Sequence, residues 1–128
     1  DKGNNVILDR YTTSNMGHQA GKIKDKAERL KMFKWIEELE YNLLKLPKPD
    51  IKVFLYMPYE YSKSLQTNRV ELDEHELSED NLRHAENAYL EMVDLYDFIK
   101  IDCIENSSIR SIEDINDEIY SHILEKLN

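Results

Sequence analysis

Short apolar runs alternate with longer segments of helical periodicity along this chain, and this alternation restricts the fold more than any other feature. Strand-type runs are expected at residues 6–8, 52–57 and 98–104,. The segments between them are predicted to be helical. Strands separated by helices favour right-handed crossover connections, which produce a parallel sheet flanked by helices. We therefore predict an α/β fold.

The longest helical segment covers residues 24–46. Its apolar residues recur three or four positions apart, at Leu30, Phe33, Ile36, Leu39, Leu43 and Leu46,. This spacing predicts one buried stripe along the helix. Pro47 ends the helix, because proline has no amide donor and disfavours a helical conformation at the residue before it.

The other helices are expected to be shorter. They are predicted at residues 13–20, at 60–66, after a cap at Ser78 and after a cap at Ser111,. The last of them has an apolar stripe at Ile112, Ile115, Ile119, Ile123 and Leu127. Residues 67–79 are charged and lack a period, which predicts a loop.

Composition limits the classes of function. The 128 residues suit a single domain, and 26 acids against 17 bases give a net charge of −9. An acidic chain is a poor match for nucleic acid or an acidic membrane, which need a basic surface. The single Cys103 cannot form an internal disulfide, and no apolar run reaches the length of a membrane span,.

A polar cluster follows the first apolar run. Asp9 and Arg10 come directly after residues 6–8, and Ser14 and Asn15 follow. In an open parallel sheet the carboxyl ends of the strands are where ligands bind. Asp9 can hold a metal ion or accept a proton, and Arg10 can bind a phosphate with two hydrogen bonds. The alternative is an ordinary strand end with a helix cap and a surface arginine.

Three segments resemble the thymidylate (dTMP) kinase family. Residues 6–11, with Ser14, Asn15 and Gln19, resemble its "DRY" segment. Residues 46–55 are similar to its "LPxPD" turn before a buried strand. Residues 73–76, with a tyrosine thirteen residues later, resemble its lid. The segments stand in the family's order. The resemblance implies the fold of a P-loop nucleoside monophosphate kinase, with residues 1–128 as the C-terminal part of one kinase domain and a lid at about 67–79.

The family's phosphate-binding loop is absent from these residues. That loop has the pattern G-x-x-x-x-G-K-[ST] after a strand. The nearest approach, residues 17–23, is one residue short between its glycines and has Ile23 where a hydroxyl is needed. The resemblance therefore implies part of a longer kinase, and we expect this stretch alone to be inactive.

The resemblance also implies roles for the charged residues. Arg10 would bind the monophosphate of the acceptor, and Asp9 would lie beside the phosphates and help to position Mg²⁺. Arg69, before the lid, would stabilise charge on the transferring phosphoryl group. These three residues are the expected catalytic set. The alternative for the acidic loop around the lid is that its charges serve solubility.

Further residues match positions that bind the acceptor nucleotide in the family. Besides Arg10, they are Ser14, Asn15, His18, Gln19, Asp73 and Glu76. Asn15 and Gln19 would read the pyrimidine edge, and as residues four apart they share one helix face. His18 stands where the family often has an aromatic residue. The alternative for this face is contact with solvent alone.

The function implied by the resemblance is phosphoryl transfer from MgATP to dTMP, giving ADP and dTDP. ATP would be the co-substrate and Mg²⁺ the cofactor, in a cytoplasmic enzyme that is a homodimer. Two alternatives stay open. One is a non-catalytic remnant that binds a nucleotide but has lost the phosphate loop, and the other is a different nucleoside or nucleotide kinase of the same fold.

Overall fold

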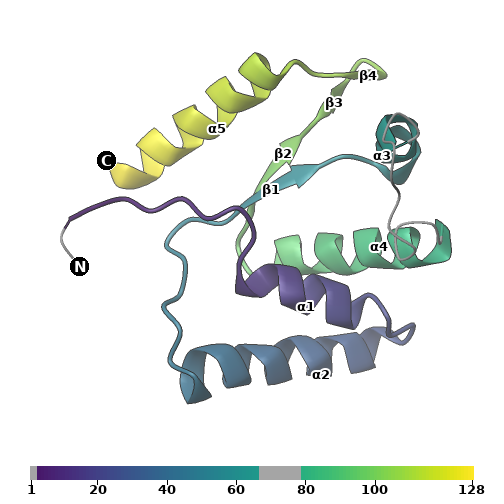
Figure 1. Ribbon diagram of the computed structural model, residues 1–128, viewed down its shortest axis with the longest axis vertical. Coiled ribbons are helices and arrows are strands. Elements are labelled where there is room, and N and C mark those ends of the chain that lie inside the picture. Colours follow the sequence, from purple (N-terminus) through teal and green to yellow (C-terminus); the bar gives the residue numbers. More distant parts are fainter. Residues whose placement is uncertain (1–2, 67–78) are drawn as a thin grey trace.

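The computed structural model describes residues 3–66 and 79–128 (Figure 1). The helices are α1 (Thr12–Ala20), α2 (Lys26–Glu37), α3 (Tyr59–Gln66), α4 (Glu79–Leu95) and α5 (Ile112–Leu127), and a π-helical segment, η1 (Glu38–Leu43), continues α2. The strands are β1 (Val53–Tyr56), β2 (Ile99–Asp102), β3 (Ile104–Glu105) and β4 (Ser108–Ile109). Among the described residues, no helix has the length and apolar character that crossing a membrane requires.

The strands form a parallel pair and a short hairpin. β1 and β2 pair in parallel, with Val53 opposite Ile99 and Tyr56 opposite Asp102. β3 and β4 are antiparallel, joined by Asn106 and its neighbour in the left-handed backbone region that a tight hairpin turn needs,. The predicted α/β class with a parallel sheet flanked by helices is confirmed for the described residues. The predicted strand 98–104 is interrupted at Cys103, where β2 gives way to the hairpin.

The core lies between α1, α2 and α4, which Figure 1 shows on the opposite side of the sheet from α5. Its buried residues are Met16, Ala20, Phe33, Ile36, Ala88 and Met92. Each belongs to one of these three helices, so the predicted stripe of residues 24–46 is confirmed at its second and third positions, Phe33 and Ile36. The other leucines of that stripe are partly or largely exposed.

Helices α1 and α4 approach each other closely because small residues face the contact. A Cβ atom at Gly17 would lie 2.5 Å from Cζ of Tyr89, which is closer than such atoms come in proteins. A Cβ atom at Gly21 would lie 3.1 Å from Cα of Ala85. Glycine is therefore required at position 17 for the Tyr89 ring to lie against α1.

The predicted strand at residues 6–8 is wrong. These residues have no regular structure, and Ile7 is 90% exposed. A strand needs a neighbour for its backbone donors and acceptors, and among the described residues β1 pairs with β2 alone. The residue types at positions 6–8 favour a strand, but the described part of the chain offers no neighbouring strand with which their backbone could pair.

The place of the polar cluster also differs from the prediction. The hydroxyl of Tyr11 donates to the carbonyl of Pro47 over 3.0 Å. The start of α1 therefore lies beside the segment that leads into β1, rather than at the carboxyl end of a strand. Residues 9–15 are positioned by α1 and by its contacts with η1 and α4, as described below.

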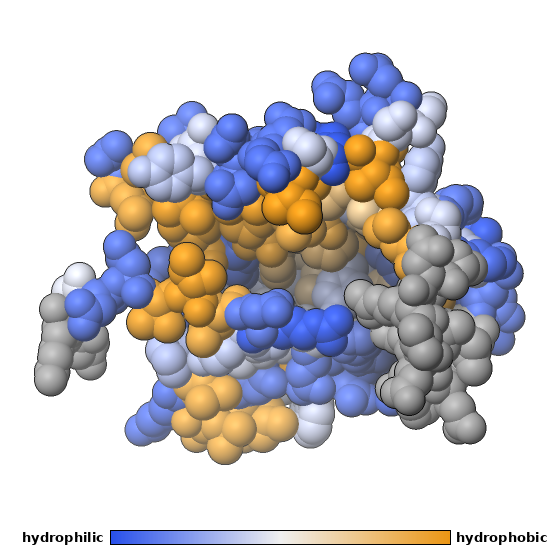
Figure 2. Space-filling model, turned by 45° about the horizontal axis from the view of Figure 1, so that its top comes forward, coloured by the Kyte–Doolittle hydropathy of each residue, from blue (hydrophilic) through white to orange (hydrophobic). Residues whose placement is uncertain are grey.

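Helix α5 contains the predicted apolar stripe, but the stripe is not part of the core. Among the described residues no residue of α5 is buried, and Ile112 is 83% exposed. The predicted cap is confirmed, since Ser111 Oγ accepts from the amide of Asp114 over 3.1 Å. Figure 2 turns the α5 side of the molecule toward the reader. Apolar side chains lie at the surface on this face, around a hollow.

Candidate functional site

The first two predicted site residues lie in the bend before α1. Asp9 and Arg10 are exposed, and neither side chain has a hydrogen-bond or ion-pair partner among the described residues. The backbone of Arg10 has a φ of 66°, a left-handed conformation that costs a non-glycine residue about 1–2 kcal/mol. Such strain is found at functional sites more often than elsewhere. Both charges are therefore available to a ligand.

The outward face of α1 carries the next four predicted residues. Ser14 accepts a hydrogen bond at its carbonyl from the Tyr89 hydroxyl over 3.3 Å. His18 meets the Tyr89 ring edge-on, with 5.9 Å between ring centroids. Asn15 and Gln19 are exposed one turn apart, as their spacing predicts. The structure thus brings the α1 members of the predicted set to one surface, with Tyr89 beside it.

Behind this surface, aromatic rings stack in sequence. The Tyr89 ring lies parallel to Phe54, with 5.6 Å between centroids and 11° between planes, and Phe54 in turn stacks on Tyr56. The Tyr56 hydroxyl donates to Glu86 over 2.9 Å. Burial and this carboxylate raise the pKa of Tyr56 to about 12, so its hydroxyl stays protonated. The stack holds α4 against β1 and supports the ring that touches α1.

Two cations lie near His18 on the α1 surface although the chain is acidic overall. Partial burial lowers the pKa of His18, and the positive charges of Arg10 and Lys22 lower it further. The imidazole is therefore neutral at pH 7. Arg10 and Lys22 therefore bring two positive charges close to His18, and such charges can attract a phosphate group,.

One buried residue near this surface was not predicted. Glu40, in η1, is 8% exposed. Its Oε1 accepts from Asn15 Nδ2 over 3.1 Å, and its Oε2 is buried with no partner among the described residues. Glu40 follows Ile36 by four positions and Phe33 by seven, so helical spacing alone places it on the buried face. A glutamate at a core position was the signal that the sequence offered.

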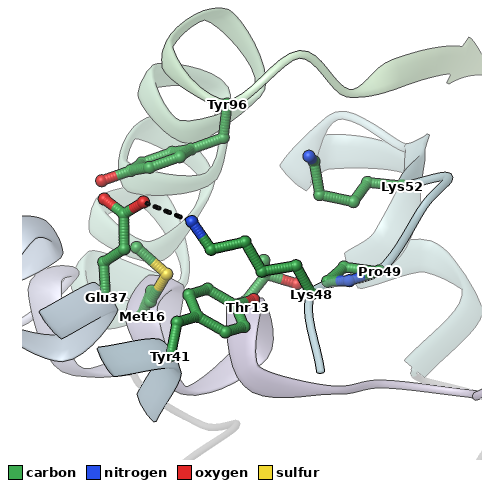
Figure 3. Close-up of a pocket in the computed structure, with 8 residues that line it drawn as sticks. All are labelled: Thr13, Met16, Glu37, Tyr41, Lys48, Pro49, Lys52 and Tyr96. Atoms are coloured by element: carbon green, nitrogen blue, oxygen red, sulfur yellow. Dashed lines mark ion pairs between the residues drawn. The ribbon is translucent and has the colours of Figure 1, made fainter. Parts of the chain in front are cut away.

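The described residues also form a pocket at the amino end of β1. Its volume is about 150 Å³, and it is lined by Thr13, Met16, Glu37, Tyr41, Lys48, Pro49, Lys52 and Tyr96 (Figure 3). Figure 3 shows Lys48 reaching between the rings of Tyr41 and Tyr96 toward Glu37, with 3.9 Å between the ammonium and the carboxylate. Because Lys48 is paired inside the chain and no predicted site residue lines the pocket, this pocket is not the predicted site.

The remaining predictions lie outside the described residues. Arg69, Asp73, Glu76 and the cap at Ser78 fall in the segment 67–78, as does nearly all of the predicted lid. For the metal, Asp9 is the only residue proposed. Within residues 3–66 and 79–128, no three histidine, cysteine or acidic side chains come together in a way that would hold a metal ion.

Comparison with known proteins shows similarity to thymidylate kinase. A stretch of 81 residues is 33% identical to thymidylate kinase from Mycobacterium tuberculosis, in strain CDC 1551 / Oshkosh and in strain ATCC 25618 / H37Rv. Part of this chain is similar to a thymidylate kinase. The matched stretch covers 63% of the chain and 37% of each relative. No family model matches the chain, and no solved structure matches it.

Proposed function

We propose that this chain forms the acceptor-nucleotide part of a kinase that transfers a phosphoryl group from MgATP to dTMP, giving ADP and dTDP. The observation that carries the proposal is the similarity of 81 residues to thymidylate kinase. The geometry of the α1 surface supports it, because the residues of that surface which match the family motif lie together. A kinase of this kind needs positioned charges rather than a nucleophile from the protein.

Arg10 is proposed to bind the phosphate of the acceptor. Its guanidinium is exposed, and it has no partner among the described residues. A planar guanidinium can donate two parallel hydrogen bonds to a phosphate, which fixes both its position and its orientation. Lys22 adds a second positive charge to the same region.

Asp9 is proposed as one Mg²⁺ ligand. Magnesium in nucleotide enzymes is commonly held by one or two carboxylates together with substrate phosphates and water, and a single exposed carboxylate beside Arg10 fits that arrangement. Bound Mg²⁺ would neutralise phosphate charge during transfer. Arg69 is proposed to stabilise the transferring group, with Asp73 and Glu76 near the acceptor sugar, on the strength of the sequence motif.

Ser14, Asn15, His18 and Gln19 are proposed to bind the nucleoside. Asn15, His18 and Gln19 are exposed and Ser14 is half-buried on α1, and Arg10 lies near enough to His18 to lower its pKa. The neutral His18 imidazole can donate or accept a hydrogen bond, or lie against a sugar or base. The amides of Asn15 and Gln19 can read a pyrimidine edge.

Binding of the ATP phosphates is proposed to use a part of the polypeptide other than residues 1–128, since these lack the pattern G-x-x-x-x-G-K-[ST],. The intact mass of the natural polypeptide, measured under denaturing conditions, is the first experiment. We expect a mass well above 15.2 kDa and dTMP-dependent ATP consumption by that polypeptide. We also propose that it is a cytoplasmic homodimer, which sedimentation and cell fractionation would test.

The role of Arg10 is tested by Arg10→Ala in the same polypeptide. We expect kcat/KM for dTMP to fall by about 100-fold or more, because a charged bidentate contact is lost. Lys34→Ala, which removes an exposed cation from α2, is the matched control and should keep full activity. An unchanged kcat/KM in Arg10→Ala would refute the assignment.

A second candidate function is compatible with the absence of the pattern G-x-x-x-x-G-K-[ST] from residues 1–128. A remnant that binds dTMP without transferring phosphate would show dTMP-dependent thermal stabilisation, a mass of 15.2 kDa and no ATP consumption. The replacement of an aromatic residue by His18 also leaves room for a related kinase with another acceptor. Comparing turnover of several nucleoside monophosphates separates that alternative from the dTMP kinase.

A further inference from the structure

The buried carboxylate of Glu40 has no evident structural purpose. Glu40 lies on the same buried helix face as Phe33 and Ile36. Only one of its carboxylate oxygens has a hydrogen-bond partner among the described residues. A buried carboxylate with an unsatisfied oxygen destabilises a fold compared with a well-packed apolar side chain. Its presence therefore calls for an explanation other than packing.

The hydrogen bond from Asn15, which is the one bond that the Glu40 carboxylate makes within residues 3–66 and 79–128, supplies that explanation. A carboxylate accepts hydrogen bonds and does not donate them, whereas the Asn15 amide has an acceptor side and a donor side. With Glu40 beside it, Asn15 must turn its NH₂ group toward the carboxylate, as it does over 3.1 Å. The reverse orientation would set two acceptor oxygens against each other.

Fixing one side of the amide also fixes the other. Asn15 is exposed on α1, next to Ser14 and one turn before Gln19. Since its NH₂ group is held by Glu40, its Oδ1 is the group presented away from the carboxylate. An asparagine held only by solvent could turn over and offer either a donor or an acceptor to a ligand.

We propose that Glu40 is a positioning residue that makes Asn15 select pyrimidines with a ring N–H. Thymine and uracil carry a hydrogen-bond donor at the ring nitrogen between their two carbonyl groups, and Asn15 Oδ1 accepts from it. Cytosine has an acceptor at the equivalent nitrogen and would face the oxygen of Asn15. Two opposed acceptors are rejected strongly where the orientation of the protein group is fixed. This inference rests on the proposed function.

The test is Glu40→Gln, which keeps size and shape but can donate as well as accept, so both amides can turn over. We expect the ratio of kcat/KM for dTMP to that for dCMP to fall by about 10-fold or more. The thermal midpoint should stay the same or rise, because a buried charge is removed. Glu38→Gln, the same change at an exposed residue of η1, is the matched control and should leave the ratio unchanged.

A double-mutant cycle with Asn15→Ala shows whether Glu40 acts through Asn15. In the Asn15→Ala background, Glu40→Gln should leave the dTMP-to-dCMP ratio unchanged. The inference is overturned if Glu40→Gln keeps the parent ratio, if it changes the ratio equally without Asn15, or if it lowers the thermal midpoint, which would show a structural role. A parent protein that does not use dTMP overturns the proposed function, and this inference with it.

Discussion

The layer of α1, α2 and α4 and the two ends of the chain contain the same kinds of apolar side chain but use them differently. In the helical layer, Phe33 and Met92 are fully buried. In the N-terminal segment and in α5, Ile7 and Ile112 are almost fully exposed. The sequence periodicity is as regular in α5 as in α2. A periodic stripe therefore shows that a face can be buried, while burial itself requires an opposing face of matching shape.

The matching shape is visible where α1 meets α4. Gly17, Gly21 and Ala85 remove side-chain volume from the contact, so the two backbones come close and the Tyr89 ring fits between them. At α5, the local ion pairs of Arg110 hold the start of the helix instead. Its guanidinium bonds Asp114 over 2.7 Å and Glu118 over 2.5 Å. That fixes the helix end without covering its apolar face.

Paired alanine substitutions should show the largest difference between the two regions. Ile36→Ala removes a fully buried side chain from α2 and should lower the free energy of unfolding by about 2–5 kcal/mol. Ile112→Ala makes the same chemical change at an exposed position and should change it by less than about 0.5 kcal/mol. Urea denaturation of both variants and the parent protein measures the difference.

If Ile36→Ala and Ile112→Ala lowered the free energy of unfolding equally, the proposed difference between the two regions would be wrong. A large loss for Ile112→Ala would mean that the face of α5 is covered in solution, by a second copy or by polypeptide outside the described residues. Repeating the measurement at several protein concentrations separates those two causes, because only association between copies depends on concentration.

A smaller effect is expected from Gly17→Ala. Alanine is favoured over glycine inside a helix by about 1 kcal/mol, but its Cβ would lie 2.5 Å from the Tyr89 ring. The ring is stacked on Phe54 and cannot move away freely. We expect a net loss of about 1–3 kcal/mol, as for overpacked cores, measured by urea denaturation. Tyr89→Leu in the same protein should remove most of the loss, and a stabilised Gly17→Ala would refute the steric requirement.

The elements of this fold were predicted wherever local residues decide them. Ser111 caps α5, and the apolar run that ends at Tyr56 forms β1. The long helical region ends at Leu43, three residues before the end predicted from Pro47. These features depend on a few neighbouring residues. The strand predicted at residues 6–8 failed because pairing depends on another strand, and the described part of the chain does not provide one.

The candidate site was predicted only in part for the same reason. The face shared by Asn15 and Gln19 follows from a spacing of four, and the structure has it. The contact of Tyr89 with Phe54 joins residues 35 positions apart, and that of Glu40 with Asn15 joins residues 25 apart. The periodicity of residues along one helix or strand cannot show which side chain, far away in the sequence, a given residue contacts. The unsatisfied oxygen of Glu40 is likewise a property of packing alone.

The smallest expected effect on stability comes from charge pairs, which should contribute more in the helical layer than on α5. Arg29 in α2 binds Glu91 in α4 through two hydrogen bonds of 2.9 and 2.7 Å, and these bonds lower the pKa of Glu91 below its ordinary 4.5. The resulting stability is present above pH 4.5 and is lost as the pH falls through the lowered pKa. Glu91→Gln should therefore be less stable than the parent at pH 7 by about 1 kcal/mol.

The two proteins should converge in stability in acid, where the parent carboxylate is also protonated. Urea denaturation at pH 7, 5 and 3 measures this approach. Glu125→Gln, which changes an exposed carboxylate on α5, should match the parent at every pH because solvent screens its charge. A gap between Glu91→Gln and the parent that stays constant even where the parent carboxylate is protonated would show that the loss comes from packing of the Gln side chain rather than from its charge.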